Sequence, residues 1–434
     1  MTLSPEVVTL ICCLGIGGSH GRNHRGGATA AAYERVAYEG RPGLVGLLSK
    51  NFFLTLITIG IYRFWAATRL RRYLWSNVRI GGDGLEYTGT GRELFLGFLV
   101  GLAVLAPLSI VYIVAYRLSL GSPVMAGTIQ GIYFLALFVF LQVALFRSRR
   151  YRLSRTSWRG IYAGQTGSTW HYLGLYLGYG LLTVVTLGLA LPWMHVALAR
   201  YKLNNTTFGN RTMHIEAKGS ALFWRWLVVM VLVLVPLALA VLPNLSALLH
   251  PVYVEQPKGP PTLQTPRPGA FAFLFLAVVL GGLALVWYRI EAFRYLAARV
   301  RLAAIQLHSG AKGMSGVGQV LLYFLGLLGL TVALGIVVVV VIMSALPIVK
   351  GAVAGKTLAP ETLGLIGVGV MLPIYVILLW VGQLITYCWL WIPIIKHLAT
   401  TLDIENFAAA NEIAQSTQPR QKLGIADSFE LGAF

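Results

Sequence analysis

The sequence predicts an α-helical polytopic membrane protein, with an internal duplication of a broken helix plus a helix pair and short cytoplasmic β-hairpins between the spans. Its composition indicates this class, because 57% of the 434 residues are hydrophobic, 12% are charged and the mean hydropathy is +0.71. Soluble domains average about 25% charged residues. A second indication is a series of apolar runs of about 20 residues, the length that crosses a bilayer as a helix.

Eight such runs are candidate membrane segments. They cover residues 45–66, 94–117, 124–146, 170–199, 221–249, 270–290, 317–346 and 362–392. The first and the fourth contain helix breakers, in "TIGIYRFW" and "TLGLALPW", where glycine loosens the helix and Pro192 interrupts it. We therefore expect two broken helices and six unbroken ones.

The two broken helices belong to a block of sequence that occurs twice. Residues 54–91 align with residues 182–219 at a constant offset of 128, without a gap. The identical pairs include Thr55 and Thr183, Thr58 and Thr186, Gly60 and Gly188, Trp65 and Trp193, Arg72–Tyr73 and Arg200–Tyr201, and Asn77 and Asn205. Identity at residues with special geometry, and not merely at apolar ones, indicates a duplication.

A shorter pattern, Arg-Tyr followed by two short strands, recurs after several apolar segments. Arg-Tyr begins at residues 72, 150, 200 and 294, and Lys396–His397 is a relaxed version before the tail. Alternating apolar and polar residues around a glycine turn, as in "VRIGGDGLEYTG", predict β-hairpins. Because an isolated hairpin is marginally stable in water, we expect these hairpins to form one cytoplasmic β layer. The alternative is a set of independent amphipathic turns at the headgroup level.

Loop charges predict the topology. The loops after the first, third, fourth and sixth segments carry four to six Arg or Lys residues each, whereas "LSLGSP", "YVEQPKGPPTLQTPRPG" and "KGAVAGKTLAPE" are poor in them. Positively charged loops stay in the cytoplasm, so the first and fourth segments enter and return on the same side. This predicts six full spans in three pairs, with both termini cytoplasmic. The alternative keeps eight spans and leaves one positive loop outside.

These segments divide the chain into a leader, three membrane repeats and a tail. The repeats cover residues 35–150, 151–294 and 295–406, of which the third is shortened; residues 1–34 form a disordered leader and residues 407–434 a cytoplasmic tail. The leader contains Cys12, Cys13, His20 and His24, whose spacing matches no zinc pattern. We therefore expect no metal site and no cofactor.

The stretch "TIGIYRFWAATRLRRYLWSNVRIGGDGLEYTGTGRELFLG" resembles the YjgN family of bacterial inner-membrane proteins, which is built on a domain of unknown function. The family pattern runs from TLGIY through PWA, a basic cluster with Arg-Tyr, Asn-Thr and a hairpin to YTG. Here Arg63–Phe64 replaces the usual Ser-Pro, and Val78 the usual Thr. The second copy keeps Pro192–Trp193 and Asn205–Thr206 but loses the basic run.

This resemblance extends from Arg35 to about Asn406, over nearly the whole chain. It implies a multi-pass protein of the bacterial inner membrane. It implies no activity, substrate or catalytic residue.

The apolar segments lack the residues that catalysis needs. None of the 15 acidic residues falls inside a segment as drawn, and neither a nucleophile motif nor a phosphate-binding glycine loop occurs. An enzyme that acts within the membrane needs titratable groups at membrane depth, where such groups are costly and functional by default. Because the segments contain no acidic residue, we expect no enzyme and no catalytic residue. The polar residues near or within the segments are expected to be interfacial or to hydrogen-bond between helices: Lys50, Asn51, Gln142, His171, His195, Gln319 and Gln383.

The first functional hypothesis is a transporter or channel-like protein for an unidentified solute. Paired broken helices form the substrate sites of several transporters near the middle of the bilayer. The predicted pathway would be lined by Thr58, Gly60, Trp65, Thr186, Gly188, Pro192 and Trp193. The two copies are parallel and not inverted, which weakens the analogy.

The second hypothesis is a membrane scaffold or envelope-assembly factor, whose cytoplasmic hairpins and Arg clusters bind lipid headgroups or a protein partner. The predicted interface residues are Arg69, Arg71, Arg72, Tyr73, Arg150, Tyr151, Arg200, Tyr201, Arg294 and Tyr295. Anionic headgroups are the expected partners, together with an unidentified protein or a second copy of the chain. We expect no nucleic acid, because the net charge of +20 resides in short loops beside apolar segments. An intramembrane enzyme, the third hypothesis, lacks the required carboxylates and nucleophile.

Overall fold

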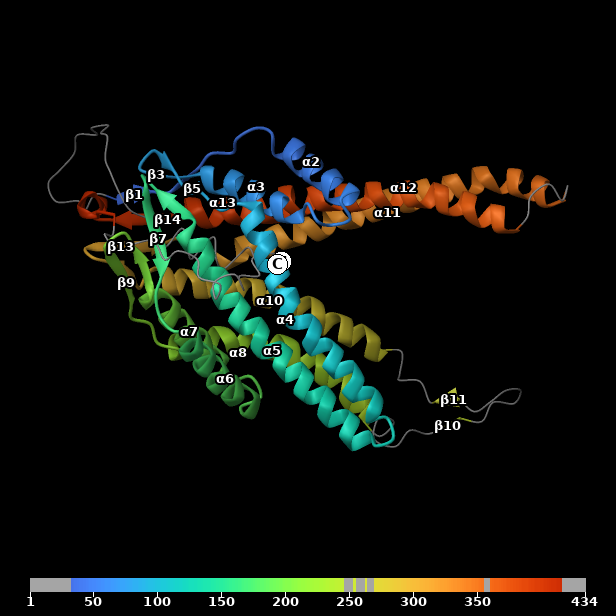
Figure 1. The fold of residues 1–434 in the computed structure, drawn as a ribbon, viewed down its shortest axis with the longest axis horizontal. Coiled ribbons are helices and arrows are strands. Elements are labelled where there is room, and N and C mark those ends of the chain that lie inside the picture. Colours follow the sequence, from blue (N-terminus) through green and yellow to red (C-terminus); the bar gives the residue numbers. More distant parts are fainter. Residues whose placement is uncertain (1–32, 246–252, 255–261, 264–268, 355–359, 416–434) are drawn as a thin grey trace.

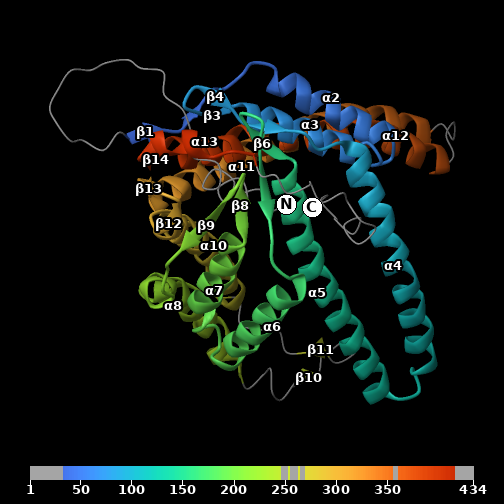
Figure 2. The ribbon, with the colours of Figure 1, turned by 60° about the vertical axis from the view of Figure 1, so that its left-hand side comes forward.

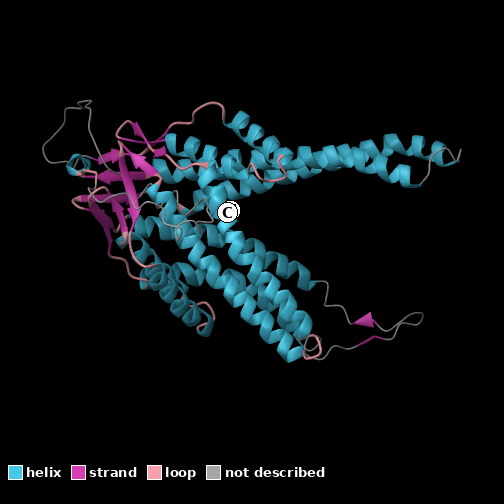
Figure 3. Ribbon diagram, in the orientation of Figure 1, coloured by secondary structure: helices cyan, strands magenta, loops and turns pink. Residues whose placement is uncertain are grey.

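The computed structural model describes residues 33–245, 253–254, 262–263, 269–354 and 360–415. Long helices extend from one end of the molecule, where the strands gather (Figure 1, Figure 3). The cysteines and histidines of the leader, residues 12, 13, 20 and 24, lie outside the described residues, as does most of the predicted tail.

Six helices of the described part are long and apolar enough to cross a membrane, which agrees with a polytopic membrane protein. The long helices are α4 (Gly91–Leu118), α5 (Pro123–Ser154), α8 (Ser220–Val241), α10 (Gly269–Ala297), α11 (Gly313–Ala354) and α12 (Pro360–Ile385). A short η1 (Leu242–Asn244) extends α8, and α12 continues through a π-helical turn, η2 (Thr386–Trp391), into α13 (Ile392–Thr400). Contacts pair α4 with α5, α8 with α10 and α11 with α12.

Several helices are longer than the apolar pattern predicts. We expected the third segment to end at residue 146, but α5 continues to Ser154. Arg150 and Tyr151 therefore lie on its last turns and not in a loop. Apolar composition marks only the apolar part of a helix. The basic end of α5 is also helical, and its side chains bond to the β structure described below.

The first and fourth segments each form two short helices that pack against each other. The first is α2 (Leu44–Ile57) and α3 (Arg63–Ser76), and the fourth is α6 (Thr169–Val185) and α7 (Leu191–Asn204). Figure 2 shows the two hairpins, with α2 and α3 at the top and α6 and α7 below. These helices of 14 to 17 residues are roughly 21 to 26 Å long, shorter than a bilayer core of about 30 Å. We call residues 58–62 the first tip and residues 186–190 the second tip.

The strands are short. They pair antiparallel, in most cases with a strand that is close in sequence. They are β1 (Tyr33–Arg35), β2 (Ala37–Tyr38), β3 (Val78–Ile80), β4 (Asp83–Gly84), β5 (Glu86–Tyr87), β6 (Thr156–Trp158), β7 (Ile161–Gln165), β8 (Thr206–Phe208), β9 (Arg211–Ile215), β12 (Val300–Leu302), β13 (Ile305–Ser309) and β14 (Leu402–Glu405). A separate pair, β10 (Tyr253–Val254) and β11 (Thr262–Leu263), lies at the other end of the helices.

The strand order closes on itself, so the strands form a barrel. Nine strands pair in the order β1-β14-β13-β12-β9-β8-β7-β6-β5, and three in the order β2-β3-β4. The two sheets join twice, because β1 continues into β2 through Val36 and β4 continues into β5 through Leu85. At these joints Val36 N–H donates to Leu402 O at 3.2 Å, and Leu85 N–H donates to Val78 O at 3.1 Å. The twelve labelled strands therefore make ten continuous ones, and the predicted hairpins do share one β layer.

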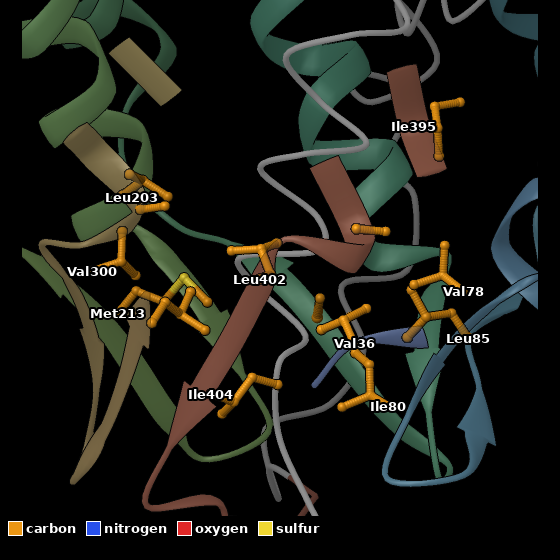
Figure 4. Packing of buried hydrophobic residues seen from close by; sticks show 14 of the residues in the cluster. Val36, Val78, Ile80, Leu85, Leu203, Met213, Val300, Ile395, Leu402 and Ile404 are labelled. Carbon is orange, nitrogen blue, oxygen red and sulfur yellow. The ribbon is translucent and has the colours of Figure 1, made fainter. Parts of the chain in front are cut away.

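The barrel interior is the main hydrophobic core. Alternate residues are buried along most of the strands, and the strand residues labelled in Figure 4 point into the space between the strands. Helix-end residues such as Leu74, Leu203 and Ile395 fill one mouth. The first residues of the predicted tail form η3 (Phe407–Glu412), and Phe407 and Ile413 belong to the same core. Closure leaves no edge strand, which stabilises strands too short to persist alone.

Five units of helix, strand, strand and helix make up this ring. Four are continuous: α3 to α4, α5 to α6, α7 to α8, and α10 to α11; the fifth combines α13 and β14 from the end of the chain with β1, β2 and α2 from its beginning. In every unit the first strand begins six residues after the start of the Arg-Tyr or Lys-His dipeptide, as at Arg72 and Val78. The motif therefore marks the point where each helix enters the barrel.

Candidate functional site

Each predicted break is a tight turn held together by a threonine side chain. Thr58 Oγ1 donates to Leu54 O at 2.7 Å and accepts from the N–H of Tyr62 at 2.9 Å. Thr186 Oγ1 makes the two equivalent hydrogen bonds in the second tip, at 2.8 and 3.1 Å. Both hydroxyl groups therefore bond to the backbone of their own turn.

A pair of left-handed residues reverses the chain at each tip. The φ angle is 50° at Ile59 and 86° at Gly60, and 50° at Leu187 and 93° at Gly188. In each tip the glycine N–H donates a 2.7 Å hydrogen bond to the carbonyl five residues earlier. Glycine adopts this conformation without the strain that a Cβ would cause, so the turn itself requires Gly60 and Gly188.

The two tryptophans of the repeated block each pack against a glycine at the start of the next long helix. A Cβ on Gly91 would lie 2.8 Å from the Cα of Trp65, and a Cβ on Gly219 would lie 2.8 Å from the Cα of Trp193. These contacts hold α3 against α4 and α7 against α8. Pro192 is buried in the first turn of α7, where a missing N–H breaks no helical hydrogen bond.

The structure does not bring the two tips together. The contacts among the described helices run in order from α3 to α4, α5 and α6, so two long helices separate the hairpins. At the tips, Ile59 is 93% exposed and Leu187 is 84% exposed. The seven residues predicted to line a pathway therefore form two separate sets, one in each hairpin.

Three of the four arginines of the Arg-Tyr motif bind the backbone of their own unit. Arg72 Nη2 donates to Gly89 O at 2.8 Å, and Arg150 Nη2 donates to Gly167 O at 2.5 Å. The third, Arg200, makes the same contact with the carbonyl of Ala217. In all three the acceptor lies 17 residues after the arginine, beyond the second strand. This bond ties the end of the incoming helix to the start of the outgoing one.

The tyrosines of the motif bind the neighbouring unit. Tyr201 donates to Ser168 O at 2.7 Å, and Tyr295 donates to Lys218 O at 3.1 Å and accepts from its N–H at 2.9 Å. Three further contacts occupy the same joint in the other units: Tyr73 with Arg41 O, Tyr151 with Glu93 Oε2 at 2.6 Å, and Lys312 N–H with His397 Nε2 at 3.4 Å. Each unit is thus joined to the next around the closed ring. We call these five contacts the ring joints.

The remaining predicted interface residues have different surroundings. Arg69 is exposed and lies over the ring of Tyr62 at 5.4 Å. Arg71 is buried, and its Nη1 donates to Tyr87 Oη at 3.4 Å. Arg294 pairs with the buried Glu291 at 2.6 Å. A prediction based on charge alone could not separate these cases. The constant spacing of six residues from the Arg-Tyr motif to the first strand was the signal that could have placed the motif where each helix enters the barrel.

Exposed basic side chains collect where the helices meet the barrel. Each lies within about two helical turns of a helix end that joins a strand. Seven of them, Lys50, Arg69, Arg92, Lys218, Arg289, Lys312 and Lys396, we call the junction belt. The acidic side chains at this level, Glu93 and Glu291, pair with Arg155 at 2.7 Å and with Arg294. The positive charges of the junction belt are therefore not neutralised by these two acidic groups.

The described residues contain no group of three or more His, Cys, Asp or Glu side chains that could hold a metal ion. An open depression of about 380 Å³ runs along α6, with His171, Gly174, Leu175, Gly178 and Tyr179 as its lining. It lies on one helix of one hairpin, from near the start of α6 to Tyr179, and does not include the tip.

Comparison with known proteins identifies the family. The curated relatives include the inner membrane protein YjgN of Salmonella typhimurium, 33% identical over 115 residues, which is 26% of each chain. YjgN of Escherichia coli O157:H7 is 42% identical over 50 residues, 12% of this chain and 13% of the relative. The matched stretches thus span about a quarter or less of these relatives. No solved structure matches.

The wider match is to a family that covers most of the chain. Residues 34–346 match the family described as bacterial protein of unknown function, DUF898. This range includes three of the five ring units in full, the fourth as far as residue 346 in α11, and both hairpins. Together with six membrane-length helices and relatives named as inner membrane proteins, it agrees with a multi-pass protein of the inner membrane. The chain belongs to the DUF898 family of bacterial proteins of unknown function.

Proposed function

We propose that this protein is a membrane scaffold, with a junction belt that binds anionic lipid headgroups and orients a rigid barrel on the cytoplasmic face. The single observation that carries this proposal is the separation of charge. The seven exposed basic residues of the junction belt lie at helix ends. The exposed acidic residues of the barrel region, such as Glu39, Asp83, Glu86 and Glu216, lie on or beside strands, where exposed arginines such as Arg211 and Arg301 accompany them. Basic residues near an anionic membrane surface contribute about 1 kcal/mol each.

Placing the barrel in the cytoplasm follows from the same charges. The basic helix ends surround the barrel, while the connection between α4 and α5 at the other end contains only Arg117 nearby. Positively charged loops favour the cytoplasm. In this orientation the two hairpins are re-entrant helices: they start and finish at the cytoplasmic barrel, and their apolar tips contact acyl chains.

An internal duplication explains why the same hairpin occurs twice. The two tips share φ angles within a few degrees and the same threonine and glycine hydrogen bonds at positions 128 residues apart. We infer that one ancestral hairpin and helix pair was copied. Two apolar hairpins that enter from one side would occupy that side of the bilayer without crossing it, which suits an anchor for the barrel.

Transport of a solute, the other prediction from the sequence, would need the two breaks to line one hydrated path. Their threonine hydroxyl groups bond to their own turns, and α4 and α5 separate the hairpins. We therefore favour the scaffold. Transport through the breaks stays a prediction, and thiol labelling of the tips tests it.

The scaffold proposal is tested by lipid preference in reconstituted vesicles. Brominated lipids quench tryptophan fluorescence on contact, and Trp170 and Trp224 are 70% and 72% exposed. We expect brominated phosphatidylglycerol to quench more than brominated phosphatidylcholine at equal mole fraction. Replacing Lys218 and Lys312 by Gln should reduce that preference severalfold, since each contributes about 1 kcal/mol.

A matched control removes two basic residues from the barrel surface. Arg211 and Arg301 are exposed on β9 and β12, and their replacement by Gln changes the net charge equally. The lipid preference should survive this change. Equal quenching of the unmodified protein by both lipids, or an equal loss in both double variants, would reject the headgroup function.

A further inference from the structure

The end of the barrel opposite the long helices, which we call the distal mouth, is closed by a segment that follows the last strand. The turns of the hairpins β6–β7, β8–β9 and β12–β13 surround this mouth, because each first strand leads away from a helix and each second strand returns. Residues 407–415 come after β14 and appear as the red segment near it in Figure 1. We call residues 407–415 the plug.

The plug presents one apolar face to the barrel. Phe407, Ala410 and Ile413 are 5%, 3% and 5% exposed, and all three belong to the barrel core. Phe407 and Ala410 lie in η3, a 3-10 helix, in which residues three apart share one face. Intervening residues such as Ala408 and Glu412 are exposed. A stripe of apolar side chains at every third position therefore anchors the plug.

Hydrogen bonds to three different hairpins hold the plug across the mouth. They are donated by Asn406 Nδ2 to Ala304 O at 3.3 Å, by Asn210 N–H to Ala414 O at 3.0 Å, and by Tyr162 N–H to Gln415 Oε1 at 3.0 Å. The partners belong to the hairpins β12–β13, β8–β9 and β6–β7. The plug thus spans the distal mouth from one side to the other.

The turn at Gly209 leaves room for the backbone of the plug. The residue after the first strand has a left-handed backbone in three units, with φ of 50° at Arg159, 53° at Gly209 and 52° at Ala303. This turn therefore accepts a side chain. At Gly209, however, a Cβ would collide with the backbone oxygen of Ala414 and lie 3.1 Å from Ile413 Cγ2. The missing side chain allows the plug to approach closely.

The closed ring of strands does not include the plug. The ring closes through β14, before the plug begins, and no described strand pairs with residues 407–415. A terminal segment held by one apolar stripe and a few hydrogen bonds opens locally more easily than the ring itself. The plug therefore has the contacts of a bound peptide and not those of a structural strand.

We propose that the distal mouth is a peptide-binding site, which the plug occupies in cis and from which a peptide of a protein partner displaces it. The ligand has apolar side chains at every third position and a backbone carbonyl for the N–H of Asn210. Backbone hydrogen bonds give affinity for many sequences, and apolar pockets give specificity, as in other peptide-binding sites. The plug is then an autoinhibitory segment.

The location of the mouth suits a protein partner. It lies at the end of the molecule away from the long helices (Figure 1), and the proposed orientation places this end in the cytoplasm. Recruitment of a partner in the cell rests on the scaffold function, whereas peptide binding in solution does not.

The test uses the full chain in detergent micelles without added lipid, and a fluorescein-labelled peptide of residues 405–415, ENFAAANEIAQ. The double change Phe407→Ser and Ile413→Ser removes the anchors of the plug and leaves the mouth intact. Fluorescence anisotropy should show that this variant binds the peptide at least tenfold more tightly than the unmodified chain, where the plug competes. A peptide with the same two changes is the control and should not bind. Absence of saturable binding by the folded variant, or equal binding by the unmodified chain, would overturn the proposal.

A substitution in the mouth locates the site. Gly209→Ala, added to the double variant, should weaken peptide binding at least tenfold, because the methyl group occupies the place of the Ala414 carbonyl. Gly160→Ala is the matched control, since its φ is 74° and its new carbon has no neighbouring group within 4 Å. The methyl group at position 209 would also lie 2.9 Å from Ile161 Cγ2, so binding is measured at a temperature where both variants remain folded. An equal effect of the two alanines would reject the site.

Hydrogen exchange of the unmodified chain provides a second measurement, which also serves if the double variant does not fold. The amides of the plug should exchange at least tenfold faster than those of β13, because the plug opens without the ring. Exchange as slow as that of β13 would make the plug a fixed part of the core and contradict displacement.

The mass of the unmodified chain in detergent tests a second copy as the occupant. A monomer, or a dimer that Gly209→Ala leaves intact, agrees with a plug bound in cis. A dimer that Gly209→Ala separates would assign the mouth to the plug of the second copy and overturn binding in cis.

The lysine variant separates this proposal from headgroup binding. Lys218→Gln and Lys312→Gln, combined with the change of both plug anchors, should reduce the preference for brominated phosphatidylglycerol but leave peptide binding intact. The anchor variant alone should keep the lipid preference of the unmodified chain. Loss of peptide binding in the lysine variant would contradict a separate site at the distal mouth.

Discussion

The phenol of Tyr201 donates a 2.7 Å hydrogen bond to the backbone carbonyl of Ser168, which precedes α6. Tyr201 lies on α7, so the bond joins the first helix of one unit to the start of the outgoing helix of the preceding unit. Contacts at the same position join all five units, including the unit made from the two ends of the chain. The Arg-Tyr motif is thus explained by the closure of a ring.

Removing one ring joint should lower stability by a modest and defined amount. Tyr201→Phe keeps the stacking of His171 on the ring, with centroids 5.0 Å apart, but removes the hydrogen bond. We expect the free energy of unfolding to fall by about 1 kcal/mol, measured by SDS-induced unfolding in mixed micelles. Tyr179→Phe, on α6, is the control and should change little. Equal values for the two variants would contradict a role for the joint.

Two glycines should respond to alanine in opposite directions. Gly188 has φ of 93°, whereas Gly178 lies inside α6, where a Cβ would have no neighbouring group within 4 Å. Gly188→Ala should destabilise the protein by about 1–2 kcal/mol because an L-residue is strained there. Gly178→Ala should stabilise it by about 0.5–1 kcal/mol, as in other helix interiors. The same unfolding assay measures both, and a loss of the same size in both would refute the turn assignment.

A third prediction concerns the contact between α3 and α4. Gly91→Ala would place a Cβ 2.8 Å from the backbone of Trp65, which cannot move aside as a side-chain tip could. We expect a loss of about 1–3 kcal/mol, typical of overpacking. Gly282→Ala in α10 has open space around the new carbon and serves as the control. If both substitutions were tolerated equally, the close approach of these helices would be wrong.

The sequence predicted the local elements well, because each has a local cause. Apolar length marked six long helices, Gly60 and Gly188 marked the reversals, and alternation around glycine turns marked strands such as β3. The closure of the barrel was not predictable in this way. It depends on β1 pairing with β14, which lie more than 360 residues apart in sequence, and strands of three or four residues carry too little pattern to reveal a partner.

The roles of the arginines were equally hidden. In a sequence, Arg69, Arg72 and Arg149 are similar members of basic clusters, and a prediction from charge places all of them at the membrane surface. In the structure Arg69 is exposed, Arg72 bonds to Gly89 O and Arg149 is buried. Near the end of a helix, the direction in which a side chain points depends on the angle at which that helix meets the barrel. That angle is a property of the assembled ring.

The orientation in the membrane gives a fourth prediction. A phosphatase or fluorescent reporter fused after Gly219, beside the barrel, should report the cytoplasm, and one fused after Leu120, between α4 and α5, should report the periplasm. Positive loops favour the cytoplasm, and the belt residue Lys218 adjoins the first fusion point. A periplasmic signal after Gly219 would reverse the orientation and reject re-entrant hairpins that start from the cytoplasm.

Thiol labelling of the tips separates the scaffold from the transporter. After replacement of Cys12, Cys13 and Cys388 by Ser, single cysteines are introduced at Thr58 and Thr186 and treated in membranes with a small permeant maleimide. Thiolates form and react in water, not in acyl chains, so tips surrounded by lipid should remain unlabelled.

Lys218→Cys, at the aqueous junction, is the positive control and should be labelled quickly in a gel-shift assay. Labelling at both tips at a rate close to this control would indicate a hydrated path through the two breaks and would support transport over the scaffold. Labelling at one tip only would show water at that hairpin without a shared path, because α4 and α5 separate the two hairpins. If one common solute also blocked labelling at both positions, that solute would be identified as the transported one.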